Sequence, residues 1–333
     1  MKKLKFLKFF FFFLIGIFIF KWVYDFFGGS EAIDLINENK TKLYLLIFAH
    51  LPTLYFDSLS WHILLKNKSF TLFWSMLITW ISQASGKFFP TGNVTGEFVR
   101  VYLSIKKGLS THEASSTVFA DLILATFSLF LMAFFSFIFI FLNDSSLINS
   151  ENSFYFYFSL CLIFLGCLFF FILIRNRLLV FFLRKINKFF KISLSKKTIF
   201  FLLKLDISLF NLIKRKKILI KALLVRLLGW VAGAFEIYIF LTIIGVEVSI
   251  SDVILIEAFS GIIRAIAFFI PAGIGVQELA FVLIGDYLGF GSAISFSIAL
   301  GRRVRELLVG LPAIFAWIYI FKNSSESKKG LTK

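Results

Sequence analysis

The stretches FFPTGNVTGE (residues 88–97) and FIPAGIGVQE (residues 269–278) interrupt two apolar segments at corresponding places in the chain. A constant shift of 181 positions lays the first stretch and the residues after it on the second. A repeat at a fixed offset indicates structurally related units. We therefore predict two related halves, each with a broken apolar segment at its centre. The matching residues are Phe88, Pro90, Gly92, Glu97, Val101, Gly108 and Ser116, which fall on Phe269, Pro271, Gly273, Glu278, Val282, Gly289 and Ser297.

The composition indicates an integral membrane protein. Of the 333 residues, 59% are hydrophobic and 19% aromatic, whereas soluble domains are about 45–50% apolar. The net charge of +17 comes mainly from Lys and Arg in residues 2–8, 66–68, 175–221 and 322–329, which flank apolar runs. Basic residues gather in this way on the cytoplasmic side of membrane proteins. We therefore interpret the charge as a sign of topology, and we expect no nucleic-acid partner.

The apolar runs predict an all-α polytopic membrane protein with about six transmembrane helices and two re-entrant helical hairpins. For the first run, a retained anchor is favoured over a cleaved signal peptide, because no small-x-small cleavage site follows it. The loop charges place both termini in the cytoplasm and the protein in the plasma (inner) membrane. The expected spans are residues 6–27, 43–65, 112–142, 154–174, 218–243 and 292–321.

The two hairpins are predicted to enter the membrane from opposite sides. The arms of the first hairpin, residues 70–81 and 94–105, would each rise about 18 Å, short of the ~30 Å hydrocarbon core. Basic residues flank that hairpin at both ends, and three full spans separate it from the second hairpin at 253–288. An odd number of spans inverts the second hairpin, as in the inverted repeats of secondary transporters.

We expect a single membrane domain over residues 1–333. Repeat one covers about 43–142, and repeat two covers about 218–321. Between them, about 175–217 alternate basic residues with Phe and Leu, which is typical of amphipathic helices on the inner leaflet.

Each hairpin contains a half-helix that begins just after a Pro-x-Gly sequence, at Gly92 and at Gly273. The free N–H groups and the positive dipole end of such a helix attract anions, including phosphate. Glu97 and Glu278 lie in the first turns of these half-helices. They either neutralise the dipole of their own helix, or also contact a cationic group of a substrate or take up a proton.

Arginines within the apolar segments are the other candidate binding residues, because a charge at bilayer depth is costly unless it is paired or functional. Arg264 lies on the entering arm of the second hairpin, and Arg302 and Arg303 lie in the middle of the last span. They either bind a phosphate or form a structural ion network. In the first half Arg100 follows the break, and Asp121 occupies the position equivalent to Arg302, which suggests an Asp121–arginine pair across the repeats.

Motifs for catalysis, metal binding or nucleotide hydrolysis are not evident in the sequence. His50 and His62 share one apolar run but lack the i, i+4 spacing of helical metal ligands. We therefore expect no cofactor, no metal and no enzymatic activity.

The two motifs, Pro90-Thr-Gly92 with Gly96-Glu97-Phe98-Val99-Arg100 and Pro271-Ala-Gly273-Ile-Gly275-Val-Gln-Glu278, resemble the lysylphosphatidylglycerol synthase transmembrane (flippase-like) family. The resemblance extends from about residue 6 to residue 321. The first half departs from the family, which often has an arginine near Ala120–Asp121. Some members also carry a cytosolic aminoacyl-transferase domain, and we expect this chain to hold the membrane domain only.

The resemblance implies translocation of a lipid across the bilayer rather than its synthesis. The expected substrate is a phospholipid or another phosphate-bearing lipid, whose anionic head group would bind at the two breaks. Two alternatives stay open: an intramembrane transferase, or an accessory subunit that partners an enzyme of lipid or polyprenyl-linked glycan synthesis. The expected substrate-binding residues are Gly92, Glu97, Arg100, Arg264, Gly273, Glu278, Arg302 and Arg303.

Overall fold

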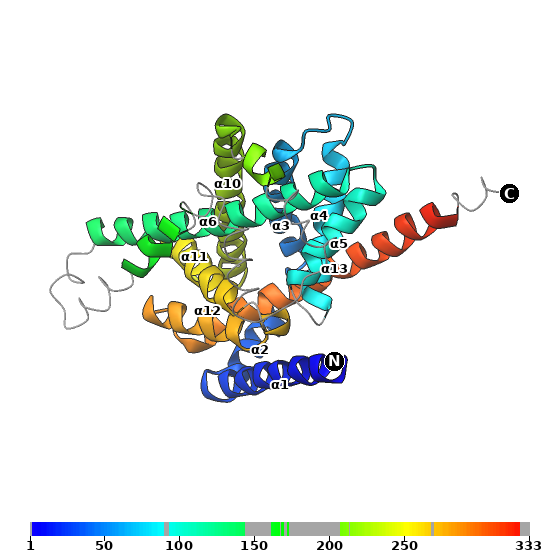
Figure 1. The fold of residues 1–333 in the computed structure, drawn as a ribbon. Helices are drawn as coiled ribbons and strands as arrows, with labels where there is room; N and C mark the ends of the chain where they lie inside the picture. Colours follow the sequence, from blue (N-terminus) through cyan, green and yellow to red (C-terminus); the bar gives the residue numbers. More distant parts are fainter. Residues whose placement is uncertain are drawn as a thin grey trace. The chain divides into compact units, whose positions relative to one another are not determined.

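The computed structural model describes residues 2–89, 93–143, 161–166, 168–169, 172, 207–212, 214–267 and 270–326. Within these residues the regular structure is helical, and no strand occurs (Figure 1). The all-helical prediction is therefore confirmed. The helices are α1 (Lys2–Phe26), α2 (Gly29–Glu38), α3 (Leu45–Leu64), α4 (Leu72–Phe88), α5 (Asn93–Lys106), α6 (Thr111–Asn143), α10 (Lys216–Ile243), α11 (Ile250–Ile266), η2 (Pro271–Gly273), α12 (Val276–Tyr287) and α13 (Ser292–Glu326).

Among the residues that the structure describes, three helices are long and apolar enough to cross a membrane, namely α6, α10 and α13. A fourth crossing is available if α1 and α2, which meet at a bend of 82°, count as one broken span. The number of six spans stays a prediction. The expected span 154–174 and the linker 175–217 fall largely outside the residues that the structure describes.

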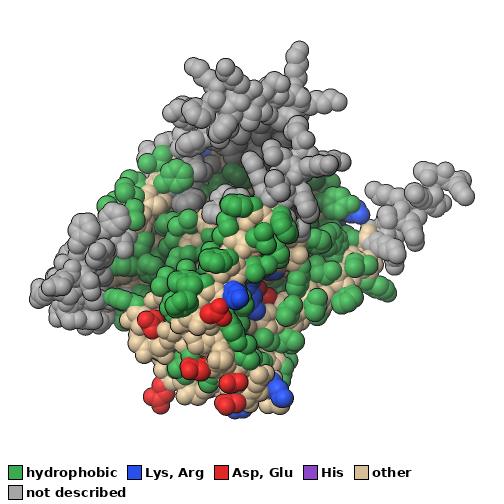
Figure 2. Space-filling model, turned by 90° about the horizontal axis from the view of Figure 1, so that it is seen from below, with side chains coloured by type: hydrophobic (Ala, Val, Ile, Leu, Met, Phe, Trp, Pro, Cys, Tyr) green, Lys and Arg blue, Asp and Glu red, His purple; other side chains and the backbone are tan. Residues whose placement is uncertain are grey.

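The long helices expose apolar side chains. On α13, Phe315 is 70% exposed and Tyr319 is 76% exposed, and on α6 Phe135 is 60% exposed. In Figure 2 hydrophobic side chains cover much of the middle of the described surface, and acidic and basic groups lie mainly in its lower part. Large apolar side chains exposed along a long helix are typical of contact with a membrane or a partner, and lipid is the partner that such composition fits.

A helix, a short break and a second helix occur twice, as the repeat in the sequence predicts. The first set is α4 and α5, and the second is α11 and α12. The shift of 181 positions carries the end of α5 at Lys106 onto the end of α12 at Tyr287. It also carries the start of α6 at Thr111 onto the start of α13 at Ser292. Whether these pairs are re-entrant and inverted stays a prediction.

The structure differs from the expected elements at α4 and at α2. Helix α4 has 17 residues and continues to Phe88, through a polar stretch that we expected to end it near residue 81. It continues because the Ser85 hydroxyl donates to the Ile81 carbonyl at 2.7 Å, so the polar group is satisfied inside the helix. The short helix α2 was not predicted, because it lies between the expected spans 6–27 and 43–65.

The chain divides into two compact units. Unit 1 comprises Met1–Tyr55, Met76–Leu103 and Gly229–Lys333, and unit 2 comprises Phe56–Ser75 and Ser104–Leu228. In unit 2 a core of buried Leu and Ala side chains joins the second half of α3 to α6 and α10. In unit 1, α12 packs against α1, α11 and α13, and α13 packs against α2. The second break lies inside unit 1.

Candidate functional site

The second break is a tight turn between α11 and α12. Its backbone takes left-handed conformations at Ala272, with φ of 53°, at Gly273, with φ of 61°, and at Gly275, with φ of 80°. A non-glycine residue at positive φ is strained by roughly 1 kcal/mol. The Ala272 carbonyl accepts a hydrogen bond from Arg303 Nη1 at 3.0 Å, which helps to hold the turn in place.

Gly275 is required by a close approach of two backbones. A Cβ atom at this position would lie 2.4 Å from the carbonyl oxygen of Gly16 and 2.8 Å from the amide nitrogen of Phe20 on α1. Gly16 in turn faces the Ile274 carbonyl, which a Cβ atom would approach to 2.9 Å. Helix α1 therefore packs directly against the turn that precedes α12.

Glu278 caps the helix on which it lies. Its Oε2 accepts from the Gly275 amide at 2.7 Å, and its Oε1 accepts from Arg303 Nε at 2.8 Å. The carboxylate is fully buried. Both oxygens are thus engaged within the protein, which favours the first of the two sequence-based interpretations, neutralisation of the helix dipole.

Glu278 and Arg303 belong to a larger group of charged side chains in unit 1, which we call the buried charge cluster. It links α4, α10, α11, α12 and α13 through ion pairs. His50 on α3 adjoins the cluster but is not counted in it. The members are Lys87, Arg264, Arg302, Arg303, Arg305, Glu236, Glu257, Glu278 and Glu306.

The arginines of this cluster differ in how fully they are paired. Arg302 and Glu257 are both buried, at 6% and 3% exposure. Two guanidinium nitrogens of Arg302 donate hydrogen bonds to the Glu257 carboxylate, and the one from Nη1 is 3.3 Å long. Arg303 contacts Glu278 and, at 3.0 Å, Glu306. Arg264 reaches Glu257 only at 4.0 Å, and it makes no hydrogen bond within the described part of the chain. Arg264 therefore has the weakest ion pairing among the arginines of the cluster.

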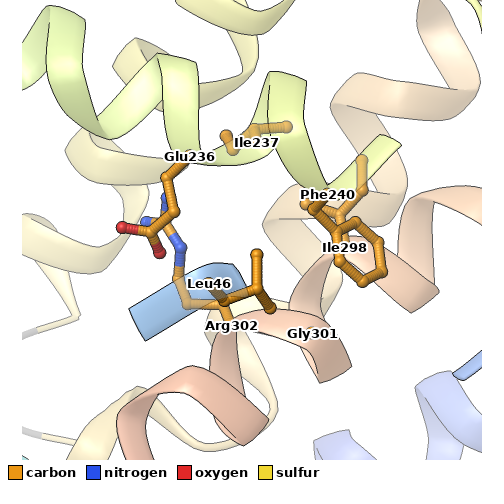
Figure 3. A pocket seen from close by; sticks show the side chains of 7 residues that line it. All are labelled: Leu46, Glu236, Ile237, Phe240, Ile298, Gly301 and Arg302. Atoms are coloured by element: carbon orange, nitrogen blue, oxygen red, sulfur yellow. The ribbon is translucent and has the colours of Figure 1, made fainter. Parts of the chain in front are cut away.

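A small cavity adjoins the cluster where Glu236 meets Arg302 (Figure 3). It measures about 10 Å³, room for about one water molecule, and apolar side chains including Phe240 line its other side. Glu236 also accepts from Arg305 Nε at 2.7 Å and lies 3.0 Å from His50 Nδ1. These contacts hold the carboxylate of Glu236, on α10, against residues of α3 and α13.

The candidate residues of the first half lie elsewhere in unit 1 and are less clustered. Arg100 is buried and its Nη1 lies 3.4 Å from Glu97 on the same helix. Gly92 lies outside the described residues. Lys87, at the end of α4, reaches across to Glu306 on α13 at 2.6 Å. The first half therefore contributes to the buried charge cluster mainly through Lys87.

Asp121 does pair with an arginine of repeat two, as predicted, but this arginine is Arg226 and not Arg302, which occupies the position equivalent to Asp121. In unit 2, Asp121 and Asp57 both bind the guanidinium of Arg226, and Ser60 donates to Asp121 at 3.2 Å. Arg302 pairs with Glu257 instead, as described above. The sequence could not distinguish these partners, because each is a buried charge on a different apolar helix.

Comparison with known proteins identifies the family. The family model for the lysylphosphatidylglycerol synthase TM region matches residues 9–313. The chain belongs to this family. The match covers the family's membrane domain and ties the protein to lipid metabolism. No curated protein and no solved structure matches the chain.

Some cluster residues were missed by sequence reasoning. Glu236 and Glu257 are carboxylates inside apolar runs, where a charge is costly unless it is paired or functional, but neither was selected as a candidate site residue. Gln277 was also missed. It lies beside Glu278 in the first turn of α12, it is fully buried, and neither atom of its amide has a partner among the described residues.

Proposed function

We propose that this protein is a lipid translocase, which moves a phosphate-bearing lipid across the bilayer without changing it chemically. The family implies lipid translocation, and we assign this activity to the second break, between α11 and α12. The head group would bind there, at Arg264 and the Ala272–Gly273 turn, while the acyl chains stay in the surrounding lipid. Membrane lipids are then its partners, and the plasma (inner) membrane is its expected location.

The observation that carries this proposal is the incomplete pairing of Arg264. Its side chain is 17% exposed, and its one ion-pair contact among the described residues, with Glu257, is 4.0 Å long. A guanidinium at membrane depth is expensive to leave unpaired, and it binds phosphate through two parallel hydrogen bonds. A phosphate that reaches Arg264 would supply the missing partner.

The surrounding cluster supports the same activity. A polar head group loses its water when it enters the bilayer, and it crosses only if protein groups replace that water. The charged side chains of α4, α10, α11, α12 and α13 provide such groups in the interior of unit 1. Exposed apolar residues on α13 would keep the acyl chains solvated by lipid.

The test is translocation in vesicles that contain only the purified protein. Fluorescent phosphatidylglycerol would be placed in both leaflets, and the outer pool would be bleached with dithionite. We expect the wild-type protein to expose the inner pool and Arg264→Gln to slow this by about tenfold, since hydrogen bonds to charged groups contribute roughly 1.5–3 kcal/mol. Arg215→Gln, which removes one charge in unit 2, is the matched control.

Two results would contradict the proposal. One is a bleaching curve for wild-type vesicles that coincides with that of protein-free vesicles. The other is a covalent change in the recovered lipid, seen by mass spectrometry, which would favour the intramembrane transferase. Activity that appears only after a synthase is added would favour the accessory-subunit alternative.

A further inference from the structure

His50 lies in the interior of unit 1, where it contacts the buried charge cluster from α3. Its side chain is 8% exposed, and its Nδ1 lies 3.0 Å from Oε2 of Glu236 on α10. Glu236 also pairs with Arg305, so its carboxylate is ionised. An ionised carboxylate only accepts hydrogen bonds, and Nδ1 of His50 therefore carries the hydrogen. The nitrogen that gains or loses a proton is Nε2, which makes no hydrogen bond within the described part of the chain.

The charged groups that face His50 come from two other helices. Glu236 on α10 contacts it directly, and Arg305 on α13 binds the other oxygen of Glu236 at 2.7 Å. Arg302, also on α13, borders the same side chain at the small cavity (Figure 3). On α3 itself the nearest acidic or basic side chain is Asp57, two turns away. A positive charge on His50 is thus stabilised by one carboxylate and opposed by two arginines.

The buried charge cluster has one more positive than negative charge when His50 is neutral. Within the described residues, five basic side chains face four carboxylates. A buried surplus of charge is costly unless an opposite charge joins it. An anion bound at the cluster would remove the surplus, and a proton could then be added to His50 at lower cost. Anion binding and proton binding are therefore expected to favour each other.

A series of charged side chains joins His50 to Arg264. Glu236 and Arg302 border one cavity, which has room for about one water molecule that could bridge them. Arg302 donates two hydrogen bonds to Glu257, and Glu257 lies 4.0 Å from Arg264. All of these residues belong to unit 1. His50 and the proposed head-group site thus lie at the two ends of one electrostatic network.

We propose that His50 is a proton-binding residue whose occupancy is coupled to that of the anion site at Arg264. One proton from water adds to Nε2 of His50 when an anionic head group binds, and it returns to water when the head group leaves. No bond of the lipid changes. The inference rests on the proposed function for the anion, and goes beyond it in naming a coupling ion. Lipid and proton then move in the same direction, and a pH gradient drives net movement of the lipid.

Proton uptake on lipid binding tests the coupling without any transport. The purified full-length protein in detergent would receive dioleoyl phosphatidylglycerol in weakly buffered solution at about pH 6.5, where unperturbed histidines are half charged. A pH-sensitive dye would report the protons, and native mass spectrometry would count the bound lipid. We expect the wild type to take up at most about one proton for each bound lipid, because one imidazole is involved.

His50→Gln should take up no proton when the lipid binds. The glutamine amide can still donate a hydrogen bond to Glu236, but it cannot become charged. A purely structural His50 would leave proton uptake unchanged in this variant. His62→Gln, the same substitution on the same helix but in unit 2, is the matched control and should behave as the wild type does.

The affinity for the lipid provides the reciprocal measurement. Histidine becomes charged between about pH 8 and about pH 5. Over this range the affinity of the wild type for phosphatidylglycerol should rise about fivefold, the lower end of typical coupling between two sites. His50→Gln should lose this rise. Phosphatidylcholine, which has no net charge, should show no such rise with the wild type.

A third measurement needs neither lipid nor a change at His50. The chain has three histidines, so NMR of protein labelled at histidine can follow each imidazole separately. Arg264→Gln removes one positive charge from the cluster, as a bound anion would. At a fixed pH the ratio of protonated to neutral His50 should therefore rise about fivefold in this variant, whereas the ratio for His62 should not change.

The inference and the proposed function fail in different ways. Lipid binding without proton uptake, or with equal uptake by His50→Gln, would overturn the coupling even if vesicle assays showed translocation. An unchanged ratio at His50 in Arg264→Gln would also overturn it. Proton uptake on binding by a protein that moves no lipid would keep the coupled site and overturn the translocase.

Discussion

The pairing of Glu257 with Arg302 leads to the sharpest prediction for stability. Both side chains are nearly inaccessible, at 3% and 6% exposure, and two hydrogen bonds join them. Glu257→Gln keeps the shape of the side chain and removes only its charge. The cluster would then hold five positive and three negative groups, with two arginines near the substituted position.

The expected loss is about 3–5 kcal/mol, the usual cost of removing one member of a buried ion pair. At roughly 2–4 °C for each kcal/mol in a large domain, the melting temperature should fall by at least about 6 °C. The assay is thermal unfolding of the purified protein in detergent, followed by intrinsic tryptophan fluorescence. Glu257→Gln combined with Arg302→Gln should recover more than half of the loss, because the charge balance is restored and two amides can bond to each other.

A double-mutant cycle decides whether this reasoning is correct. An interaction energy of about 2 kcal/mol or more between the two positions is expected for charged groups in direct contact. Independent, additive losses would refute the pairing and return Arg302 to the set of candidate head-group ligands. Retention of lipid translocation by the double variant would further show that Arg302 supports the site without binding the head group.

Other predictions follow from particular contacts and can be measured in the same unfolding assay or by labelling. Gly275→Ala should destabilise the protein by about 3 kcal/mol or more, since the new Cβ would overlap the backbone of α1. Gly289→Ala, at a similar φ of 84° but with nothing within 4 Å, should cost only about 1 kcal/mol, and equal losses for both would contradict the close approach. Asp121→Asn should cost about 3 kcal/mol, because it leaves a buried arginine with one carboxylate fewer, and an unchanged melting temperature would contradict this. If the repeats are inverted, single cysteines at Lys106 and Asp286 should react with impermeant reagents from opposite sides of the membrane, and labelling from the same side would refute the inversion.

The sequence by itself determined the class of the protein and the position of its breaks. Runs of apolar residues longer than a soluble core requires are a local property, and they identify a helical membrane protein without reference to any contact. Pro271 and Gly273 likewise interrupt the helical segment through their own backbone preferences, in the break between the end of α11 at Ile266 and the start of α12 at Val276. The repeat was visible because it preserves such local signals at a constant spacing, and the helix ends at Lys106 and Tyr287 follow it.

Only the tertiary structure decided which charges pair and which group is left over. Arg264, Arg302 and Arg303 look equivalent in the sequence, since each is an arginine in an apolar helix. They differ in their ion pairing with carboxylates on other helices: Arg302 pairs with Glu257, and Arg303 pairs with Glu278. Gln277 carried no signal in the sequence at all, because a glutamine in the first turn of a helix is unremarkable until its amide is found buried without a partner. Ion pairing and burial depend on distances between segments far apart in the chain, and the order of residues along one helix does not contain those distances.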